Sequence, residues 1–214
     1  DVVIPVAAGP EICVAATKSY AGQIAALYLL SGVLSGRDLT DSLLQIPALS
    51  EITVENTDIS AVADMCARSS GVYFLGRDID FAVALEGSLK LKEVSYIPSE
   101  GYPAGELKHG TLALIDESAV AVVVITSERL AGKSKNAVEQ VLSRKGKVAV
   151  ITCLETIANE LKDRAEIVKI PDCGEFLSPL VSSVVLQLIA YQTAVTLNRD
   201  PDKPRNLAKS VTVE

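Results

Sequence analysis

The sequence predicts an α/β protein, a three-layer α/β/α sandwich built on a parallel sheet. From residue 71 onward, short stretches rich in Val and Ile alternate with longer stretches of helical pattern. Strands that alternate with helices form right-handed βαβ units, whose helices cover both faces of a parallel sheet. With 214 residues, 49% of them hydrophobic and 22% charged, the chain can bury a substantial core. We therefore expect one α/β domain, with at most a piece of another.

The first part of the chain precedes this regular pattern. Residues 1–9 have the pattern of a buried strand that ends in a turn, with no earlier strand to pair with. This start suggests a chain taken from a longer protein. Thr17 is a plausible N-cap for a helix from Lys18 to Ser35, which Gly36 would close.

The remaining elements follow in order. Residues 38–60 mix short helical stretches with turns, and Ile59–Ser69 has a helical pattern. The expected elements after Gly71 are a strand at 72–76, a helix at 79–94, a short extended stretch at 96–99, a turn-rich segment to Gly110, a strand at 119–125, a helix at 129–144, a strand at 147–152, a helix at 155–163, a strand at 166–170 and a helix at 175–197. The last seventeen residues, 198–214, contain two prolines and predict an irregular tail.

Composition excludes several function classes. The net charge of −7 has the wrong sign for a grip on nucleic-acid phosphates. The longest unbroken apolar stretch, Ala119–Ile125, is too short to span a bilayer, and no signal peptide opens the chain. Four cysteines without C-x-x-C spacing and a single histidine support neither a disulfide framework nor a zinc site. We expect a cytoplasmic protein without metal, cofactor, nucleic-acid or membrane partner.

A nucleotide site is the first alternative for such a fold, because open α/β sheets often bind nucleotides at their strand ends. After the strand at 72–76, however, Arg77 and Asp78 stand where a second glycine would be needed. The tripeptide Gly-Lys-Ser at 132–134 resembles the end of a P-loop, but Ser127 replaces its first glycine. Both fingerprints are incomplete, so we do not expect a nucleotide.

One face of the helix at 79–94 is more informative. Glu86, Lys90 and Glu93 fall within a sector about 60° wide, opposite apolar residues such as Leu91. The pattern allows a solvated face with an i, i+4 ion pair. It equally allows a carboxylate that moves a proton, with a cation beside it to hold an anion.

The only histidine, His109, lies in a segment from Ser99 to Gly110 that contains three glycines and one proline. This composition predicts a shaped loop, and loops at strand ends are where sites are assembled. His109 can be an ordinary surface residue, or a group that exchanges protons near neutral pH.

Three segments carry a family resemblance: AGPEICVAATKSY at 8–20, LGRDIDFAVALEGSLKLKEVSYIPSEGYPAGELKHGTLALID at 75–116, and DPDKPRNLAKSVTVE at 200–214. They resemble the isomerase half of the glutamine:fructose-6-phosphate aminotransferases, also called glucosamine-6-phosphate synthases. The resemblance implies a sugar isomerase (SIS) fold. It also implies a dimer whose full chain has a glutamine-hydrolysing domain followed by two SIS lobes. We then expect 1–40 to be the end of the first lobe, 41–60 a connection, 61–197 the second lobe and 198–214 the tail.

The resemblance also implies a reaction, the conversion of fructose 6-phosphate and glutamine into glucosamine 6-phosphate and glutamate. Glu93 matches the base that moves a proton between C1 and C2 of the sugar. Lys90 matches a lysine that supports the enolate-like intermediate, and Glu86 matches a carboxylate that lines the site. His109 matches a histidine that opens the sugar ring from the neighbouring subunit. Lys209 matches a lysine that forms a Schiff base with the open ketose, a role that needs a neutral amine.

Further matches line the sugar, and two features depart from the family. Val14, Thr17 and Ala208 match sugar-lining positions, and the backbones of Val14 and Ala208 would touch the sugar. Ala16 stands where the family commonly has serine, so that hydroxyl contact is absent. The family's phosphate-binding loops match no part of this chain, and neither does the glutaminase nucleophile. We expect the chain alone to perform no glutamine-dependent synthesis and at most trace isomerisation.

Two alternatives remain open. The chain could belong to a related SIS sugar-phosphate deaminase or deglycase, although AKSVTVE argues against that reading. It could also be a sugar-phosphate-binding module without chemistry, because fold alone does not fix function. The joint presence of Glu93, His109 and Lys209 argues against a pure sensor, which needs none of them.

Overall fold

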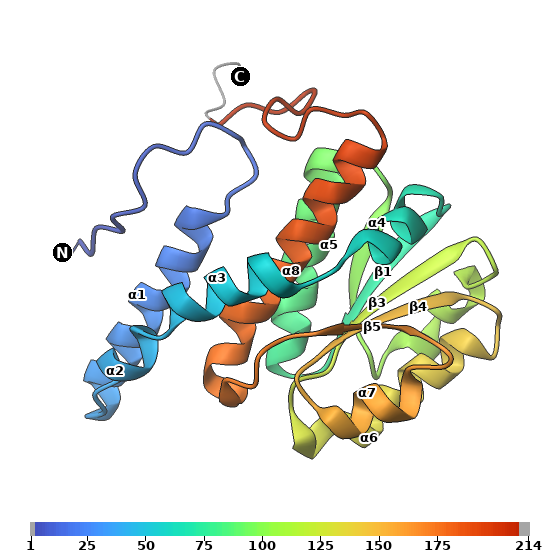
Figure 1. Cartoon of the computed structure of the whole chain (residues 1–214), viewed down its shortest axis with the longest axis horizontal. Helices are drawn as coiled ribbons and strands as arrows, with labels where there is room; N and C mark the ends of the chain where they lie inside the picture. The colour runs from blue at the N-terminus through green and yellow to red at the C-terminus, as the bar shows by residue number, and fades with distance from the viewer. Residues whose placement is uncertain (1–2, 210–214) are drawn as a thin grey trace.

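The computed structural model describes residues 3–209 and has a five-stranded sheet between two helical layers (Figure 1). The strand order is β2-β1-β3-β4-β5, and every pair of neighbours is parallel. The strands are β1 Gly71–Gly76, β2 Ser99–Pro103, β3 Ala119–Val124, β4 Lys147–Thr152 and β5 Glu166–Lys169. The helices are α1 Lys18–Ser35, α2 Thr40–Leu43, α3 Ile46–Asn56, α4 Ser60–Ala67, α5 Ile79–Ser95, α6 Glu128–Leu142, α7 Glu155–Leu161 and α8 Gly174–Thr196, with short 3-10 turns η1 Leu107–His109 and η2 Thr111–Leu114. The predicted three-layer α/β/α sandwich is confirmed.

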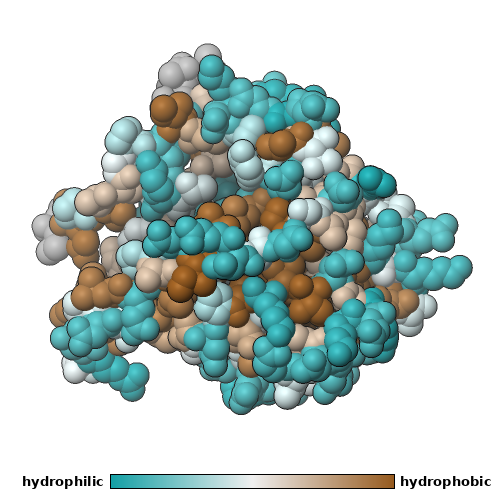
Figure 2. All heavy atoms as spheres, in the orientation of Figure 1, coloured by the Kyte–Doolittle hydropathy of each residue, from teal (hydrophilic) through white to brown (hydrophobic). Residues whose placement is uncertain are grey.

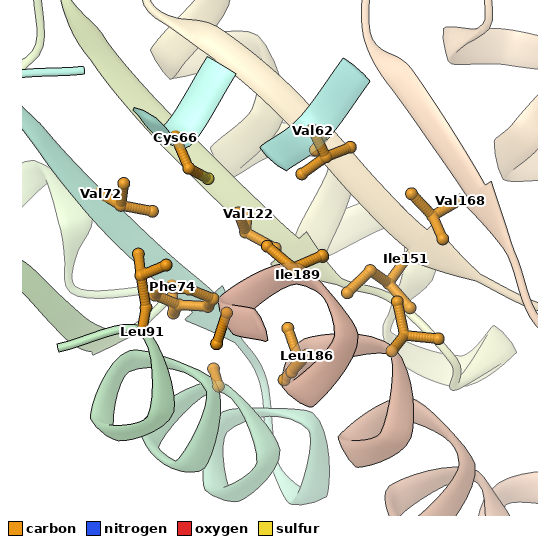
Figure 3. Close-up of a cluster of buried hydrophobic side chains, with 14 of the residues drawn as sticks. Val62, Cys66, Val72, Phe74, Leu91, Val122, Ile151, Val168, Leu186 and Ile189 are labelled. Atoms are coloured by element: carbon orange, nitrogen blue, oxygen red, sulfur yellow. The ribbon is translucent and has the colours of Figure 1, made fainter. Parts of the chain in front are cut away.

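The alternation of side chains along the strands creates two cores. Phe74, Val122 and Ile151 point toward one helical layer, where they pack against residues of α4, α5 and α8 (Figure 3). The intervening residues, such as Leu75 and Val123, pack against α6 and α7. All six residues of the central strand β3 are buried, as expected for a parallel strand covered on both faces.

Helices α5 and α8 pack closely against each other and against β1. A Cβ atom at Gly87 would lie 2.7 Å from Leu186 Cδ1 and 3.0 Å from the Phe74 ring, so glycine permits this approach. Both helices run back across the sheet and end beside the amino ends of the strands. α8 is long and apolar enough to cross a membrane by length and composition, but 61% of that stretch is buried inside the protein. It serves as a core helix here.

Two of the expected strands need correction. Residues 3–9 form no strand, and Val3 and Ile4 are exposed; residues 1–2 lie outside the described part of the chain. An isolated apolar segment cannot satisfy strand hydrogen bonds without a neighbouring strand, and none lies beside residues 3–9 in the described structure. The extended stretch expected at 96–99 is instead β2 at 99–103. Tyr96 adopts a left-handed conformation that ends α5, so pairing with β1 starts only at Ser99.

The other boundaries agree with the sequence to within a few residues. Helix α1 begins and ends as predicted, and Gly36 closes it in the left-handed conformation at φ 69°. After α8, residues 198–209 form no helix or strand. In Figure 1 this red segment passes over the ends of α5 and α8 toward the blue amino-terminal segment. The predicted tail also includes Ser210–Glu214, which lie outside the described residues.

Candidate active site

The charged face of α5 is buried, not solvated. Lys90 is only 3% exposed. Its Nζ lies 2.6 Å from Glu93 Oε2 and 3.6 Å from Glu86 Oε1. Burial, and to a lesser extent the charge of Glu86, raise the pKa of the Tyr20 phenol of α1 to about 12. The interpretation as a solvated face is therefore wrong, and the three residues form a partly desolvated ionic cluster.

The carboxylates of this cluster retain unused acceptor oxygens. Burial raises the pKa of Glu86; Lys90 opposes this shift, and the charge of Glu93 adds to it. Glu86 Oε1 and Glu93 Oε2 are buried and have no hydrogen-bond partner among the described residues. The contact between Lys90 and Glu93 is thus an ion pair by distance, without the angles of a hydrogen bond. A carboxylate held beside a cation in this way can exchange a proton with a bound molecule.

A cavity of about 320 Å³ opens beside Lys90. It lies between segments that are far apart in the sequence: the irregular segment before α1, the last turns of α5 and α8, and the tail. Its lining residues are Pro10, Glu11, Ile12, Cys13, Ala15, Thr17 and Lys18, then Lys90 and Val94, then Gln187, Ala190 and Tyr191, and finally Pro201 and Asp202. Such a volume suits a small polar metabolite.

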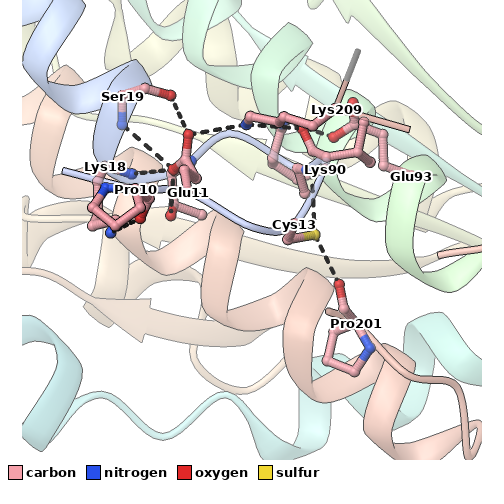
Figure 4. Close-up of polar contacts among 12 residues, drawn as sticks. Pro10, Glu11, Cys13, Lys18, Ser19, Lys90, Glu93, Pro201 and Lys209 are labelled. Carbon is pink, nitrogen blue, oxygen red and sulfur yellow. Dashed lines mark hydrogen bonds and ion pairs between the residues drawn. The ribbon is translucent and has the colours of Figure 1, made fainter. Parts of the chain in front are cut away.

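Glu11 organises the segment before α1 (Figure 4). Its Oε1 accepts hydrogen bonds from the backbone N–H groups of Thr17 at 2.8 Å and Lys18 at 3.0 Å, and from the Thr17 hydroxyl at 3.2 Å. Its Oε2 accepts one from the Ser19 hydroxyl. Thr17 occupies the predicted N-cap position but makes no side-chain cap, so Glu11 satisfies the free N–H groups instead. Burial raises the pKa of Glu11, but the hydrogen bonds from Ser19, Thr17 and Lys209 outweigh it and hold the pKa well below its usual range.

The tail completes the site. Lys209 Nζ donates to Glu11 Oε2 at 3.1 Å and to the Val14 carbonyl at 3.5 Å. The Cys13 thiol donates to the Pro201 carbonyl at 3.0 Å (Figure 4). Lys209 is therefore held against the segment that lines the cavity, although 198 residues separate it from Glu11 in sequence.

The remaining predicted site residues divide into two groups. Ala16 is half-buried on the segment before α1, and Ala208 is exposed beside Lys209. His109, in contrast, is exposed in η1, and no hydrogen bond of its ring occurs among residues 3–209. The edge strand β2 carries the chain from the carboxyl end of α5, beside the amino ends of the strands, to the carboxyl ends of the strands before η1 begins. The structure thus brings His109 nowhere near Glu93 of the same chain.

The usual ligand position of such a sheet is unsuited to phosphate. The strand order places the topological switch point between β1 and β3. A hollow of about 300 Å³ lies there, lined in part by Asp78, Glu175 and Arg129. Arg129 is already paired with Asp78 at 2.9 Å, and the carboxylates would repel an anion. The Gly-Lys-Ser tripeptide at 132–134 lies inside α6, where its N–H groups are used within the helix, so it forms no P-loop, in agreement with the incomplete sequence motif.

Sequence reasoning missed two features of the site, Glu11 and Cys13. Glu11 lies six residues before the N-cap of α1, outside the spacing of the usual capping motifs. An acidic residue upstream of a helix start is a weak signal, since helix N-termini favour negative charge. Cys13 gave no signal, because its partner is a backbone carbonyl in the tail.

Fold and site together define an α/β domain that carries a buried acid–base cluster beside a small cavity. The model of the SIS domain family matches residues 65–197, and the chain belongs to this family.

Relatives match beyond the domain itself. The chain is 41% identical, over 219 aligned residues, to the isomerizing glutamine–fructose-6-phosphate aminotransferase of Legionella pneumophila strain Paris; the match covers all of this chain and 36% of that protein. The structure resembles the C-terminal domain of glucosamine-fructose-6-phosphate aminotransferase from Francisella tularensis, with a TM-score of 0.79 and 31% identity over 91% of this chain and 58% of that one. A glucosamine-6-phosphate deaminase from Thermotoga maritima, with a TM-score of 0.72 and 24% identity over 93% of this chain and 58% of that one, shares the fold alone. The chain thus spans about a third of the curated relatives it matches.

Proposed function

We propose that this chain is the isomerase portion of a glutamine–fructose-6-phosphate aminotransferase. It would bind fructose 6-phosphate and convert the ketose into the amino aldose glucosamine 6-phosphate. The likeness to the Legionella protein over the whole chain supports this assignment. Residues 1–40 would then belong to a preceding SIS lobe, 41–60 to a connection, 61–197 to the second lobe and 198–214 to the tail. A glutaminase domain elsewhere in the full-length protein would supply ammonia, in the cytoplasm.

One observation carries the proposal. Lys209 is held by Glu11, which lines the cavity, while Lys90 lines it from α5 and is paired there with Glu93. An amine, a base and a cation at one small cavity are the groups that ketose–aldose isomerisation requires. A sensor that only binds sugar phosphate needs no such buried base.

Lys209, Glu93 and Lys90 would each perform one step of the proposed isomerisation. The Lys209 amine, once deprotonated, adds to the ketose carbonyl and forms a Schiff base with loss of water; ammonia then displaces the lysine, so that the sugar keeps the new nitrogen and Lys209 is released. Glu93 takes a proton from C1 and returns it at C2, since its carboxylate is paired by distance with Lys90 and accepts no hydrogen bond among the described residues. Lys90 stabilises the negative charge that develops between these two steps. Glu86 would line the same site, and its charge balances that of Lys90.

The remaining matched residues would bind the sugar. The Val14 and Ala208 backbones and Thr17 would contact it, and Ala16 would leave one hydroxyl contact unmade. His109 would act on the site of the neighbouring subunit in a homodimer, because in its own chain it lies beyond the carboxyl end of β2, whereas Glu93 lies beside the amino ends of the strands.

Borohydride trapping tests the proposal. The full-length protein is incubated with fructose 6-phosphate, and borohydride reduces any imine to a stable secondary amine. Mass spectrometry should locate the sugar on Lys209, and Lys209→Arg should remove the adduct while keeping the positive charge. Lys203→Arg, at an exposed lysine of the same tail, is the matched control and should leave the adduct unchanged. No adduct in the unmodified protein, or an undiminished adduct in Lys209→Arg, would contradict the Schiff-base role.

A further inference from the structure

The Glu11 carboxylate has no role in the reaction described above, yet it lies on the wall of the cavity. Its side chain is only 9% exposed. One oxygen accepts hydrogen bonds from the start of α1, and the other accepts them from Ser19 and Lys209. A carboxylate with so many donors is fixed in one orientation, so any cation paired with it is fixed as well.

Lys209 needs such a partner. Its side chain is 41% exposed and extends from a segment without helix or strand. The other contacts of the tail, at Pro201 and Arg205, lie at least four residues earlier. Besides Glu11, its Nζ meets only the Val14 carbonyl, at the outer limit of 3.5 Å, among the described residues. A flexible lysine would otherwise sample many rotamers.

Lys209, and not the nearby Lys18, supplies the ammonium that pairs with the Glu11 carboxylate. Lys18 is only seven residues from Glu11 and donates its backbone N–H to it. The Lys18 ammonium, however, donates to the Pro10 carbonyl at 2.8 Å. Among the described residues, Lys209 is therefore the side-chain cation that pairs with Glu11.

We propose that Glu11 is a positioning residue for Lys209, which holds the Lys209 Nζ atom against the cavity-lining segment before the sugar arrives. The catalytic value of this contact rests on the proposed function, but the contact itself does not. When the amine leaves to attack a carbonyl, Glu11 keeps its bonds to Thr17, Lys18 and Ser19. The carboxylate therefore stays in place and can receive the ammonium again after product release.

The first experiment measures the contact without any reaction. Lysines of this chain are reductively methylated with ¹³C-formaldehyde, and the Lys209 signal is identified by its loss in Lys209→Arg. In the unmodified sequence, an ammonium held by Glu11 should give a dispersed Lys209 signal. In Glu11→Gln, the signal should move to the position of a free lysine. An identical Lys209 signal in both proteins would overturn the proposal.

The second experiment measures the consequence in the full-length protein. Glu11→Gln keeps an oxygen for the N–H groups of α1 but loses the charge, and misplacement of a reacting group can cost about 10²-fold in rate. Borohydride trapping of fructose 6-phosphate at Lys209 should slow by about this factor at saturating sugar. The sugar concentration for half-maximal trapping should stay within about twofold, because sugar binding itself is unchanged. Glu11→Asp, which keeps the charge on a shorter side chain, should recover part of the rate.

A control separates positioning from helix capping. Ser19→Ala removes one donor to the same carboxylate and should lower thermal stability, yet it leaves the charge beside Lys209 in place. Its trapping rate should therefore stay near that of the unmodified protein. If Ser19→Ala and Glu11→Gln slow trapping equally at matched thermal stability, Glu11 acts only as a cap and the proposal fails.

The two proposals can fail separately. If the full-length protein forms no adduct while the methylated Lys209 signal still depends on Glu11, the proposed function fails and the positioning contact stands. If the adduct forms on Lys209 at the same rate in Glu11→Gln, the positioning role fails and the proposed function stands.

Discussion

Lys90 is the buried cation that pairs with both carboxylates of the site, Glu86 and Glu93. A buried ammonium is costly to desolvate unless carboxylates compensate it, and Glu86 and Glu93 do so from the same helix. Removal of Lys90 would leave two carboxylates close together in a partly buried site, where one of them would bind a proton. Lys90 therefore compensates the negative charge that the two carboxylates bring into this partly buried site.

The role of Glu93 can be tested by removing its charge. In the full-length protein, Glu93→Gln should slow proton exchange at C1 and C2 of fructose 6-phosphate by about 10²–10⁴-fold, the usual contribution of a positioned base. The change is nearly isosteric, so fold and sugar-phosphate binding should persist. Exchange is followed by NMR in deuterated water, with Glu100→Gln at an exposed position of β2 as the control. Exchange that continues at the normal rate would assign the base to another residue.

The spacing of residues predicted the cluster but not its burial. Glu86, Lys90 and Glu93 must share a face of any regular helix. Their burial arises from tertiary packing, which no local pattern encodes. The interpretation of His109 had the same limit, because its distance from Glu93 follows from the path of β2 across the sheet.

At the scale of elements, Tyr96 couples α5 to the tail. Its ring lies under two guanidinium groups, with Arg199 Cζ at 4.8 Å and Arg205 Cζ at 4.4 Å from the ring centre. Its hydroxyl also accepts the backbone N–H of Arg205 at 2.7 Å. Since Tyr96 is the residue that ends α5, it fixes the tail to the same helix that carries Lys90.

We expect Tyr96 variants to loosen the tail in steps. Tyr96→Phe loses a hydrogen bond of about 1 kcal/mol but keeps the ring. Tyr96→Ala also loses both cation–π contacts, each about 0.5–1 kcal/mol at exposed sites. Amide hydrogen exchange over 198–209 should rise slightly in the first variant and strongly in the second, while exchange in β3 stays slow. Equal exchange in the tail of all three proteins would show that Tyr96 does not anchor it.

Elements with strong local signals were predicted well. The helices α1, α5, α6 and α8 were placed within two residues of their observed bounds, because apolar patterning and the end of α1 at Gly36 are local properties. The opening strand was wrong because a strand depends on a partner, and a run of Val and Ile does not supply one. Strand β2 was displaced because the left-handed turn at Tyr96 has no glycine to mark it.

At the scale of the whole molecule, α1 leaves apolar side chains uncovered. Leu27, Leu30, Val33 and Leu34 are exposed, the last two by 78% and 79%. Figure 2 shows apolar surface on the side of the molecule where α1 and α3 lie. Several exposed apolar side chains on one helix favour association, so we expect the isolated chain to self-associate.

Light scattering at micromolar concentration measures this association. The scattering mass should exceed that of a monomer, and the double change Val33→Lys with Leu34→Lys should shift it toward the monomer because charge opposes burial of this surface. Lys substitutions at Glu51 and Glu55, exposed on α3, control for the added positive charge. A clean monomer for the unmodified chain would contradict the expectation.

The closure of the cavity by both ends of the described chain has a consequence for folding. Two contacts complete the cavity: Cys13 to Pro201, which are separated by 188 positions in sequence, and Glu11 to Lys209, which are separated by 198. In contrast, β1, α5 and β2 follow one another in sequence. Bringing the segment before α1 and the tail together closes a long loop, which costs conformational entropy. We therefore expect the sheet and its helices to form before the cavity does. The same contacts are few and partly exposed, which makes them the first to open in the native state. Opening and closing of the tail is then a local equilibrium that governs access to the cavity while the core stays folded.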